Sequence, residues 1–350
     1  MTSVEHLRRA RLLIGAALCL CLLTLLAACS RPPQLQTLEG RTMGTYWQVR
    51  LAAGATGTPL PVLRAEIEAV LEAVNAEMST YREDSVITRF NRAEAGEAVD
   101  LPEGFVRVLA AALALADQTE GAYDPTVGPL VNLWGFGPDG LREVPPEPEA
   151  IEQARARVGW QRLTFEPAQR YIVQPGGLYL DLSSIAKGDA VDRVLELLQH
   201  HRIDSAMVDI GGDLRTLGQR PDGSPWRIGI ERPVPGSREV QSVLLLPRPL
   251  AVATSGSYRN FFEHGARAFS HTIDPRSGVP VQHALVSVTV LADTCLEADA
   301  WATALGVLGP EKGFDFARQR GLAVLFITAD ADQVREIATP AMQSLLGAIP

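Results

Sequence analysis

Cysteine is scarce in this sequence, and its placement excludes several classes of protein. Four cysteines occur in 350 residues, and two of them, Cys19 and Cys21, lie in an apolar run near the N-terminus. The chain therefore has neither the cysteine density of a disulfide-stapled secreted domain nor a Cys/His cluster spaced like a zinc site. Cys295 falls in a helical pattern, where we expect a buried, inert thiol.

Several familiar phosphate-binding and catalytic signals are also missing. No segment resembles GxxxxGK[ST], the paired glycines of "VDIGGD" at 208–213 lack the GxGxxG spacing, and no hydrolase-type Ser-His-Asp order appears. Those glycines favour either a tight turn or a close approach of backbone to ligand. Positive charge is not in excess, because the net charge is −9 at pH 7. Binding to nucleic acid by broad electrostatic attraction is therefore not expected.

The only long apolar run, Leu12 to Ala28, follows arginines at 8, 9 and 11 and predicts a signal peptide over residues 1–28. It ends in "LAAC", which resembles the lipobox of bacterial lipoproteins, so we expect Cys29 to be lipidated and residues 29–36 to form a short tether. Ser30 after the cysteine favours the outer membrane. An uncleaved membrane anchor is the alternative, although the run is short for a span of about 20 residues. With Cys29 under lipid, no intrachain disulfide can form.

The sequence as a whole has a globular composition, 46% hydrophobic with 30 glycines and 24 prolines. We expect one domain over 37–345. Strand patterns alternate irregularly with helical ones, and several connections are short enough for hairpins, which predicts an α+β fold with mixed or antiparallel sheets and flanking helices. Residues 123–140 are too rich in glycine and proline for regular structure, yet they carry Leu130, Trp134 and Phe136. The helices are expected near 63–78, 102–119, 147–158, 184–201 and from 293.

The helix that starts near Asp293 separates a structural role from a chemical one. Thr294 and Glu297 form an S/T-x-x-E capping box, so Glu297 is expected to be structural rather than catalytic. Asp299 and Thr303 lie four residues apart on one helical face among alanines, where a carboxylate and a hydroxyl suit Mg²⁺. An ordinary exposed polar face explains the same spacing.

His271 stands in "FSHTIDPRSG" at 269–278, at the end of a predicted strand and before an Asp-Pro turn. A histidine facing a cavity there can act as a general base near neutral pH. The alternative is a residue that only shapes the turn.

The stretch "LDLSSIAKG" at 180–188 holds more polar chemistry than a helix N-terminus requires. Ser183 or Ser184 alone would cap the helix, which leaves Asp181, Lys187 and Gly188 unexplained. A helix N-terminus beside a lysine favours anionic phosphates.

These segments share one order along the chain, and in that order the sequence resembles the ApbE family of FAD:protein FMN transferases. The resemblance covers about residues 37–330. It is carried by "TMGTYW" at 42–47, "MSTYREDSVITRFN" at 78–91, "YDPTVGPLVNLWGFG" at 123–137, "DLSSIAKG" at 181–188, "VDIGGD", "ATSGSYRNFF" at 253–262, "HTIDPRSG" at 271–278 and "EADAWATAL" at 297–305.

The resemblance implies a role for each candidate residue. FAD is the implied substrate and Mg²⁺ the implied metal, with Ser184, Asp299 and Thr303 as metal ligands and His271 as the base. The residues implied to contact the flavin nucleotide are Met43, Tyr81, Ala122, Tyr123, Asp124, Asp181, Lys187 and Ile273.

Two positions depart from the family pattern. Asp189 stands where an aromatic residue is frequent, which questions the local packing against the nucleotide, and Ser277 stands where threonine is frequent.

The implied reaction is attack by a threonine or serine hydroxyl of an acceptor protein on the FMN phosphorus of FAD, with release of AMP. Hydrolysis of FAD to FMN and AMP, and simple flavin binding without catalysis, are the alternatives. The expected location is the bacterial cell envelope, lipid-anchored on the periplasmic side of the inner or outer membrane.

Overall fold

The computed structural model describes residues 34–140, 142, 144–233, 239–256, 260–265, 267–330 and 333–347. Cys29 and the predicted signal peptide lie outside the described residues. Within them, no helix is both long enough and apolar enough to cross a membrane.

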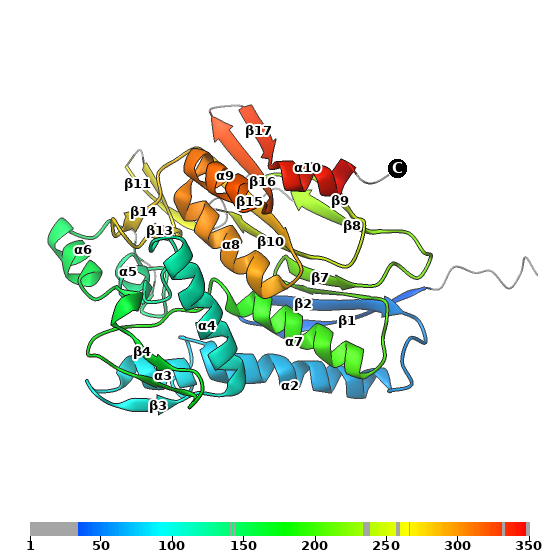
Figure 1. Ribbon diagram of the computed structural model, residues 1–350, viewed down its shortest axis with the longest axis horizontal. Coiled ribbons are helices and arrows are strands. Elements are labelled where there is room, and N and C mark those ends of the chain that lie inside the picture. Colours follow the sequence, from blue (N-terminus) through cyan, green and yellow to red (C-terminus); the bar gives the residue numbers. More distant parts are fainter. Residues whose placement is uncertain are drawn as a thin grey trace, which may run out of the picture.

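An eight-stranded sheet runs through the centre of the molecule (Figure 1). Every neighbouring pair in it is antiparallel. The α+β prediction is thus confirmed, with an antiparallel main sheet. In spatial order the strands are β1 (Leu35–Thr42), β2 (Thr45–Ala52), β6 (Ala206–Ile210), β7 (Asp213–Leu217), β10 (Ala251–Gly256), β15 (Leu285–Ala292), β16 (Ala323–Asp330) and β17 (Gln333–Ala338).

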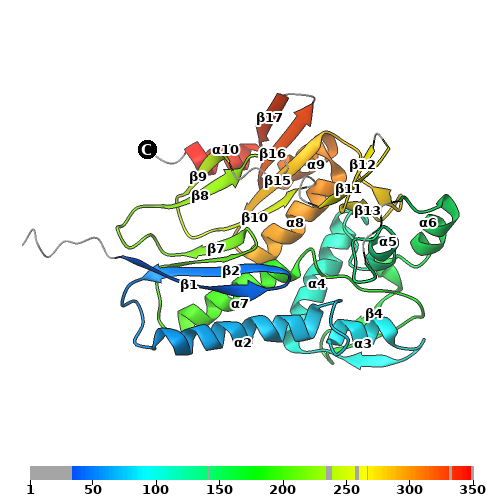
Figure 2. The ribbon, with the colours of Figure 1, turned by 180° about the vertical axis from the view of Figure 1, so that it is seen from behind.

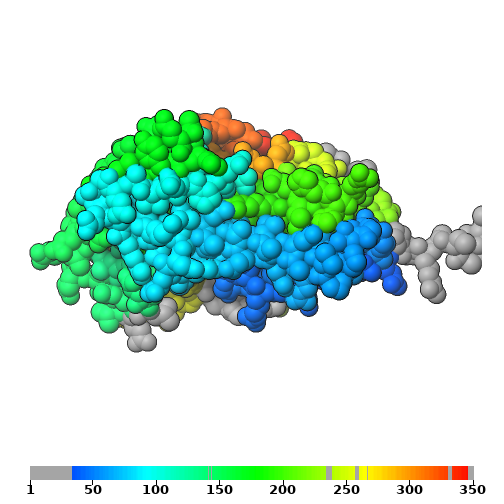
Figure 3. Space-filling view, turned by 90° about the horizontal axis from the view of Figure 1, so that it is seen from below, coloured from blue at the N-terminus to red at the C-terminus, as the bar shows by residue number. Residues whose placement is uncertain are grey.

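The two faces of this sheet carry two hydrophobic cores, because successive strand residues point to opposite sides. On strand β6, Val208 belongs to the core under the helices, whereas Met207 belongs to the core on the other face. The helical face is covered by α2 (Leu60–Met78), α4 (Glu103–Gln118), α7 (Ala186–His200), α8 (Cys295–Leu308) and α9 (Pro310–Gln319). In Figure 3, α2 and α7 run side by side on this face. The other face is covered by β8 (Trp226–Glu231), β9 (Val240–Leu246) and α10 (Pro340–Gly347), as Figure 2 shows from behind.

A smaller lobe lies beside one end of the main sheet (Figure 1). Its own apolar cluster is centred on Leu130, Trp134, Phe269 and Ile273. Its elements are α3 (Val86–Arg92), β3 (Ala98–Asp100), α5 (Gly128–Leu133), α6 (Pro148–Arg155), the 3₁₀ turn Trp160–Arg162, β4 (Thr164–Glu166), β5 (Tyr171–Val173), β11 (Phe261–His264), β12 (Arg267–Ser270), β13 (Ile273–Asp274) and β14 (Val279–Pro280).

The structure corrects one local prediction and decides between two alternatives at another position. Residues 123–140 were expected to lack regular structure, yet Gly128–Leu133 is a short helix. Pro129 sits in its first turn, where proline is compatible with a helix, and Leu130 is fully buried. The paired glycines Gly211 and Gly212 have φ of 63° and 100° and make the turn between β6 and β7, so the tight-turn interpretation holds.

Candidate active site

One cavity of about 1110 Å³ brings the predicted site residues together. It opens between the loop after α2, the segment after α4, the start of α7, the end of β10, the 271–275 turn and one face of α8. Residues spread over more than 250 positions of sequence thus converge on one volume, which is large enough for a dinucleotide. All twelve predicted residues outside the tether line it: Met43, Tyr81, Ala122, Tyr123, Asp124, Asp181, Ser184, Lys187, His271, Ile273, Asp299 and Thr303.

The predicted serine cap of α7 is wrong. The helix begins at Ala186, and the residue at its N-cap position is Ile185, which has no side-chain acceptor. The Ser183 amide donates to Asp181 Oδ1 at 2.9 Å, so the aspartate shapes the preceding turn. Ser184 Oγ donates to the Tyr123 hydroxyl at 3.1 Å. Neither serine therefore caps the helix. The Ser184 hydroxyl oxygen can still accept from, or bind, a group in the cavity.

A carboxylate from another helix caps α7 instead, and the two helices cap each other. Asp299 of α8 accepts from the Gly188 amide at 3.0 Å. In return, Asp192 of α7 accepts from the amides of Cys295 and Leu296, at 3.0 and 2.9 Å, in the first turn of α8. Each carboxylate satisfies amides that have no partner within their own helix. This reciprocal capping sets the register of Lys187 and Ser184 against Asp299 and Thr303.

Gly188 is required by the closeness of the two helices. A Cβ placed on it would lie 2.3 Å from the Cys295 carbonyl oxygen, which is backbone and cannot move aside cheaply. Cys295 itself is free and fully buried, and burial raises the pKa of its thiol, in agreement with the predicted inert core cysteine.

Thr294 caps α8 locally, as predicted, by accepting from the Glu297 amide at 3.3 Å. The other half of the predicted capping box is wrong, because within the described residues the Glu297 carboxylate makes no hydrogen bond back to Thr294. Glu297 is exposed and does not line the cavity, whereas Asp299 is 4% exposed and does. The exposed-face alternative for Asp299 is therefore wrong.

Lys187 is held between two carboxylates, one of which the sequence did not single out. Its ammonium contacts Asp213 at the start of β7 and lies 3.7 Å from Asp299 Oδ1. Burial alone would lower the pKa of Lys187, but Asp213 and Asp299 outweigh it and raise the pKa, so the lysine stays charged. Burial disfavours the charged form of Asp299 as well, and it raises the pKa of this carboxyl to about 7 although Lys187 acts in the opposite direction. An added cation beside Asp299 would favour its ionised form.

The environment of His271 defines its tautomer. The Asn260 carbonyl oxygen lies 3.1 Å from His271 Nδ1 and also accepts from the His271 amide at 3.0 Å. A carbonyl can only accept, so Nδ1 carries the hydrogen, and Nε2 of the neutral ring is an acceptor with no hydrogen-bond partner among the described residues. Burial lowers the pKa of His271, and the charge of Lys187 lowers it further. The ring is therefore neutral at pH 7, the state that a general base requires.

Two aromatic hydroxyls lie on the cavity wall in different states. Tyr81 is 68% exposed, and its hydroxyl donates to the Phe136 carbonyl oxygen at 3.4 Å, which joins two loops at the cavity. Tyr123 is buried, and burial raises the pKa of its phenol. Because Tyr123 accepts from Ser184, its own proton remains available to an acceptor in the cavity.

Met43 and Asp124 are held by turn geometry. Met43 has a φ of 49°, which is uncommon for a side chain of this size, and with Gly44 it forms the β1–β2 turn. Asp124 is buried and accepts from both the amide and the hydroxyl of Thr126 at 2.7 Å. A two-residue hairpin turn of this kind requires positive φ at both positions, so the turn itself fixes Met43 at the edge of the cavity.

Asp189 does not line the cavity, which answers the question raised by its departure from the family pattern. Its side chain is fully buried, accepts from Arg107 at 2.6 Å and lies 2.7 Å from Arg193 Nε. Arg193 also pairs with Glu77 at 2.6 Å. The four charged groups tie α2, α4 and α7 together behind the cavity. The other departure, Ser277, likewise lies outside the cavity lining.

We expect Asp189→Ala to destabilise the fold by about 1–3 kcal/mol, because it leaves Nε of the buried Arg193 without an acceptor. Glu77 still pairs with Arg193, and Arg107 is 46% exposed, so neither arginine becomes a buried, unpaired charge. Urea unfolding measures the change. Asp315→Ala removes an exposed carboxylate paired with Arg318 and should stay within about 0.5 kcal/mol. Equal effects of the two changes would contradict the role given to the buried network.

Comparison with known proteins identifies the family. The model of the ApbE family matches residues 43–326. The chain belongs to the ApbE family. The FAD:protein FMN transferase of Vibrio cholerae serotype O1 is 42% identical over 324 residues, which are 93% of this chain and 96% of that protein. The FAD:protein FMN transferase of Escherichia coli K12 is 39% identical over 316 residues, covering 89% of this chain and 90% of that one.

Solved ApbE structures share the fold. The flavin transferase ApbE from Vibrio cholerae superposes with a TM-score of 0.83 at 41% identity, covering 90% of this chain and all of that one. The apo form of the Pseudomonas stutzeri flavinyl transferase ApbE gives 0.83 at 40% identity, covering 91% and 99% of the two chains. The expected family resemblance is thus confirmed.

Proposed function

We propose that this chain is an FAD:protein FMN transferase and that the cavity binds FAD and passes FMN to a threonine or serine hydroxyl of an acceptor protein. The relatives from Vibrio cholerae and Escherichia coli are named FAD:protein FMN transferases. The observation that supports the site most directly is the neutral His271 with a free Nε2 on the wall of a dinucleotide-sized cavity. Flavin binding alone requires no such group.

In the proposed reaction the acceptor oxygen forms a bond to the FMN phosphorus of FAD. The bond between that phosphorus and the bridging oxygen breaks, and AMP leaves with the bridging oxygen. His271 Nε2 takes the hydroxyl proton, and the Asn260 carbonyl stabilises the imidazolium through Nδ1–H. Lys187 and the hydroxyl of Tyr123, which both line the cavity, would contact anionic oxygens of the nucleotide.

The donors around Asp299 fit Mg²⁺. No group of three His, Cys, Asp or Glu side chains able to hold a metal occurs among the described residues, so an all-protein site of that kind is not supported there. Asp299 keeps Oδ1 after capping Gly188, Ser184 keeps its lone pairs, and Thr303 Oγ1 lies 3.3 Å from Ser255 Oγ. One carboxylate and hydroxyls match an ion that also takes water and phosphate oxygens. When bound, Mg²⁺ would neutralise charge on the pyrophosphate.

The test is to incubate the full chain, purified in detergent, with FAD, Mg²⁺ and a candidate acceptor protein, and to weigh both products by mass spectrometry. Transfer yields equimolar AMP and an acceptor heavier by one FMN, less water. AMP with free FMN and an unmodified acceptor would indicate hydrolysis. FAD recovered intact under all conditions would indicate a binding protein.

We also propose that the chain is anchored to the periplasmic side of the cell envelope through lipid on Cys29, on the strength of "LAAC" behind a basic N-terminal segment. Cys29→Ala should leave an unprocessed precursor that takes up no labelled fatty acid. Cys295→Ala is the matched control, since it removes a buried thiol and should not change labelling. Normal processing and labelling of Cys29→Ala would refute the anchor.

A further inference from the structure

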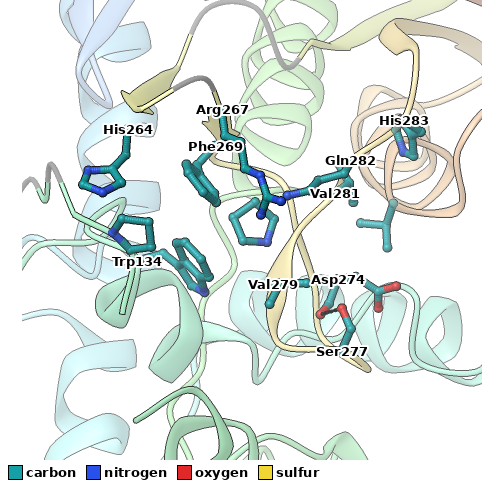
Figure 4. Close-up of a pocket in the computed structure, with 13 residues that line it drawn as sticks. Trp134, His264, Arg267, Phe269, Asp274, Ser277, Val279, Val281, Gln282 and His283 are labelled. Carbon is teal, nitrogen blue, oxygen red and sulfur yellow. Dashed lines mark hydrogen bonds between the residues drawn. The ribbon is translucent and has the colours of Figure 1, made fainter. Parts of the chain in front are cut away.

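A second hollow of about 550 Å³ lies beside the FAD cavity, and its lining differs in character (Figure 4). Arg267 and Phe269 of strand β12, Trp134, His264, Gln282 and His283 form much of the wall. In Figure 4 the Arg267 side chain extends from β12 toward the centre of the hollow. Apart from Asp274, the charged group in this lining is Arg267, and Trp134 and Phe269 add aromatic surface beside it.

The charge of Arg267 is not balanced. Among the described residues, no carboxylate lies within ion-pair distance of Arg267, and it is exposed. Among the described residues, Asp274 is the only carboxylate that lines the hollow, and Arg276 binds both of its oxygens, at 2.9 and 2.8 Å. Within the described part of the chain, whose full sequence has a net charge of −9, Arg267 is thus a cation in the hollow without an ionic partner.

The hollow is connected to the catalytic base by short structural links. Val307 lines both cavities. Phe269 stacks on Phe262 at 5.2 Å between ring centroids, Phe262 contacts Phe136 at 5.8 Å, and Phe136 contacts the His271 ring at 6.3 Å.

His271 follows Arg267 by four residues, so the two are separated by no more than about 13 Å along an extended chain. A carboxylate held by Arg267 can therefore belong to the same short segment as a hydroxyl that meets His271.

We propose that the hollow docks the acceptor protein by taking the carboxylate of an aspartate or glutamate within about four residues of the target hydroxyl. This inference rests on the proposed function, which requires a second protein to reach His271 while FAD fills the larger cavity. The guanidinium of Arg267 supplies paired donors for the carboxylate, and the rings of Trp134 and Phe269 cover the peptide beside it. Arg267 acts on acceptor affinity and takes no part in the chemistry.

The experiment uses two sets of short threonine peptides that differ at one position, where one set carries aspartate and the other asparagine. The position is moved through the neighbours on both sides of the threonine. We expect the full chain to show a KM at least about tenfold lower for the best aspartate peptide than for its asparagine twin. Arg267→Gln should abolish this difference while FAD affinity stays unchanged. Arg267→Glu should prefer lysine at the same position.

Arg227→Gln is the matched control, because Arg227 is also exposed but lies on β8, away from both cavities. Fluorescence anisotropy of labelled peptides measures docking without any transfer. A preference for aspartate in binding that depends on Arg267, with no FMN adduct on any acceptor, would support the docking site and refute the proposed function. Equal binding and KM for aspartate and asparagine peptides, or a preference that survives Arg267→Gln, would overturn the docking proposal.

Discussion

Replacing His271 by alanine should slow FMN transfer by about 10²–10⁴-fold, the usual contribution of a general base, while FAD affinity changes little. The structure supports this expectation because Nδ1 is committed to the Asn260 carbonyl and Nε2 of the neutral ring is free. Single-turnover transfer and a fluorescence titration of FAD on the same preparation separate chemistry from binding.

The alternative role for His271 is to shape the turn, because its amide and its ring both donate to the Asn260 carbonyl. His271→Asn is the control for this alternative. Its side-chain amide can still donate to that carbonyl, but it cannot take a proton. If His271 is the base, His271→Asn is as slow as His271→Ala. Recovery of transfer in His271→Asn would assign the residue to the turn alone.

The pH dependence gives a further readout on the same residue. The pKa of His271 is lowered below its ordinary value of 6.5, so the ring stays neutral until the pH falls through the lowered pKa. Transfer by the wild-type chain should decline as the pH drops below that value, because protonated Nε2 can no longer accept. With Mg²⁺ saturating at each pH, so that Asp299 stays ionised, this limb should be absent in His271→Asn.

Replacing Asp299 by asparagine should raise the Mg²⁺ concentration needed for half-maximal transfer by more than about 10–100-fold, the range found when even a supporting group is removed. Asparagine keeps an oxygen that can accept from the Gly188 amide, so the cap on α7 survives and only the charge is lost. Asp299→Ala loses both the charge and the oxygen that caps α7, so it should also reduce the free energy of unfolding by about 1 kcal/mol. A magnesium titration of transfer, together with urea unfolding, separates the two effects.

Glu297→Ala serves as the neighbour control on the same helix. The backbone amide of Glu297 donates to Thr294, and the Glu297 carboxylate takes no part in this hydrogen bond. Glu297→Ala should therefore change the free energy of unfolding by less than about 0.5 kcal/mol and leave the Mg²⁺ requirement unchanged. An unaltered Mg²⁺ titration in Asp299→Asn, or a large shift in Glu297→Ala, would reverse the assignment of ligand and structural residue.

Much of the fold was predictable because its signals are local. The helix Leu60–Met78 buries Leu63, Ile67, Leu71, Val74 and Met78, the spacing that predicted it. The Thr294 cap was also predictable, since donor and acceptor are three residues apart. The short helix Gly128–Leu133 was missed because its stability comes from burying Leu130 against the small lobe rather than from its own residues.

The candidate site divides in the same way. The order of the motifs along the sequence indicated the family, and the family resemblance implied the twelve residues that line one cavity. Residue type and spacing within a segment singled out only a few of them, such as His271, Asp299 and Thr303, and left an alternative open for each. Only the tertiary structure decided how those residues are supported. Asp299 caps a helix 111 residues earlier in the chain and Asp192 caps one 103 residues later, Asp213 holds Lys187, and the Asn260 carbonyl sets the His271 tautomer. Hydrogen bonds and ion pairs across such separations depend on how the helices and strands pack, and no local pattern in the sequence records that packing.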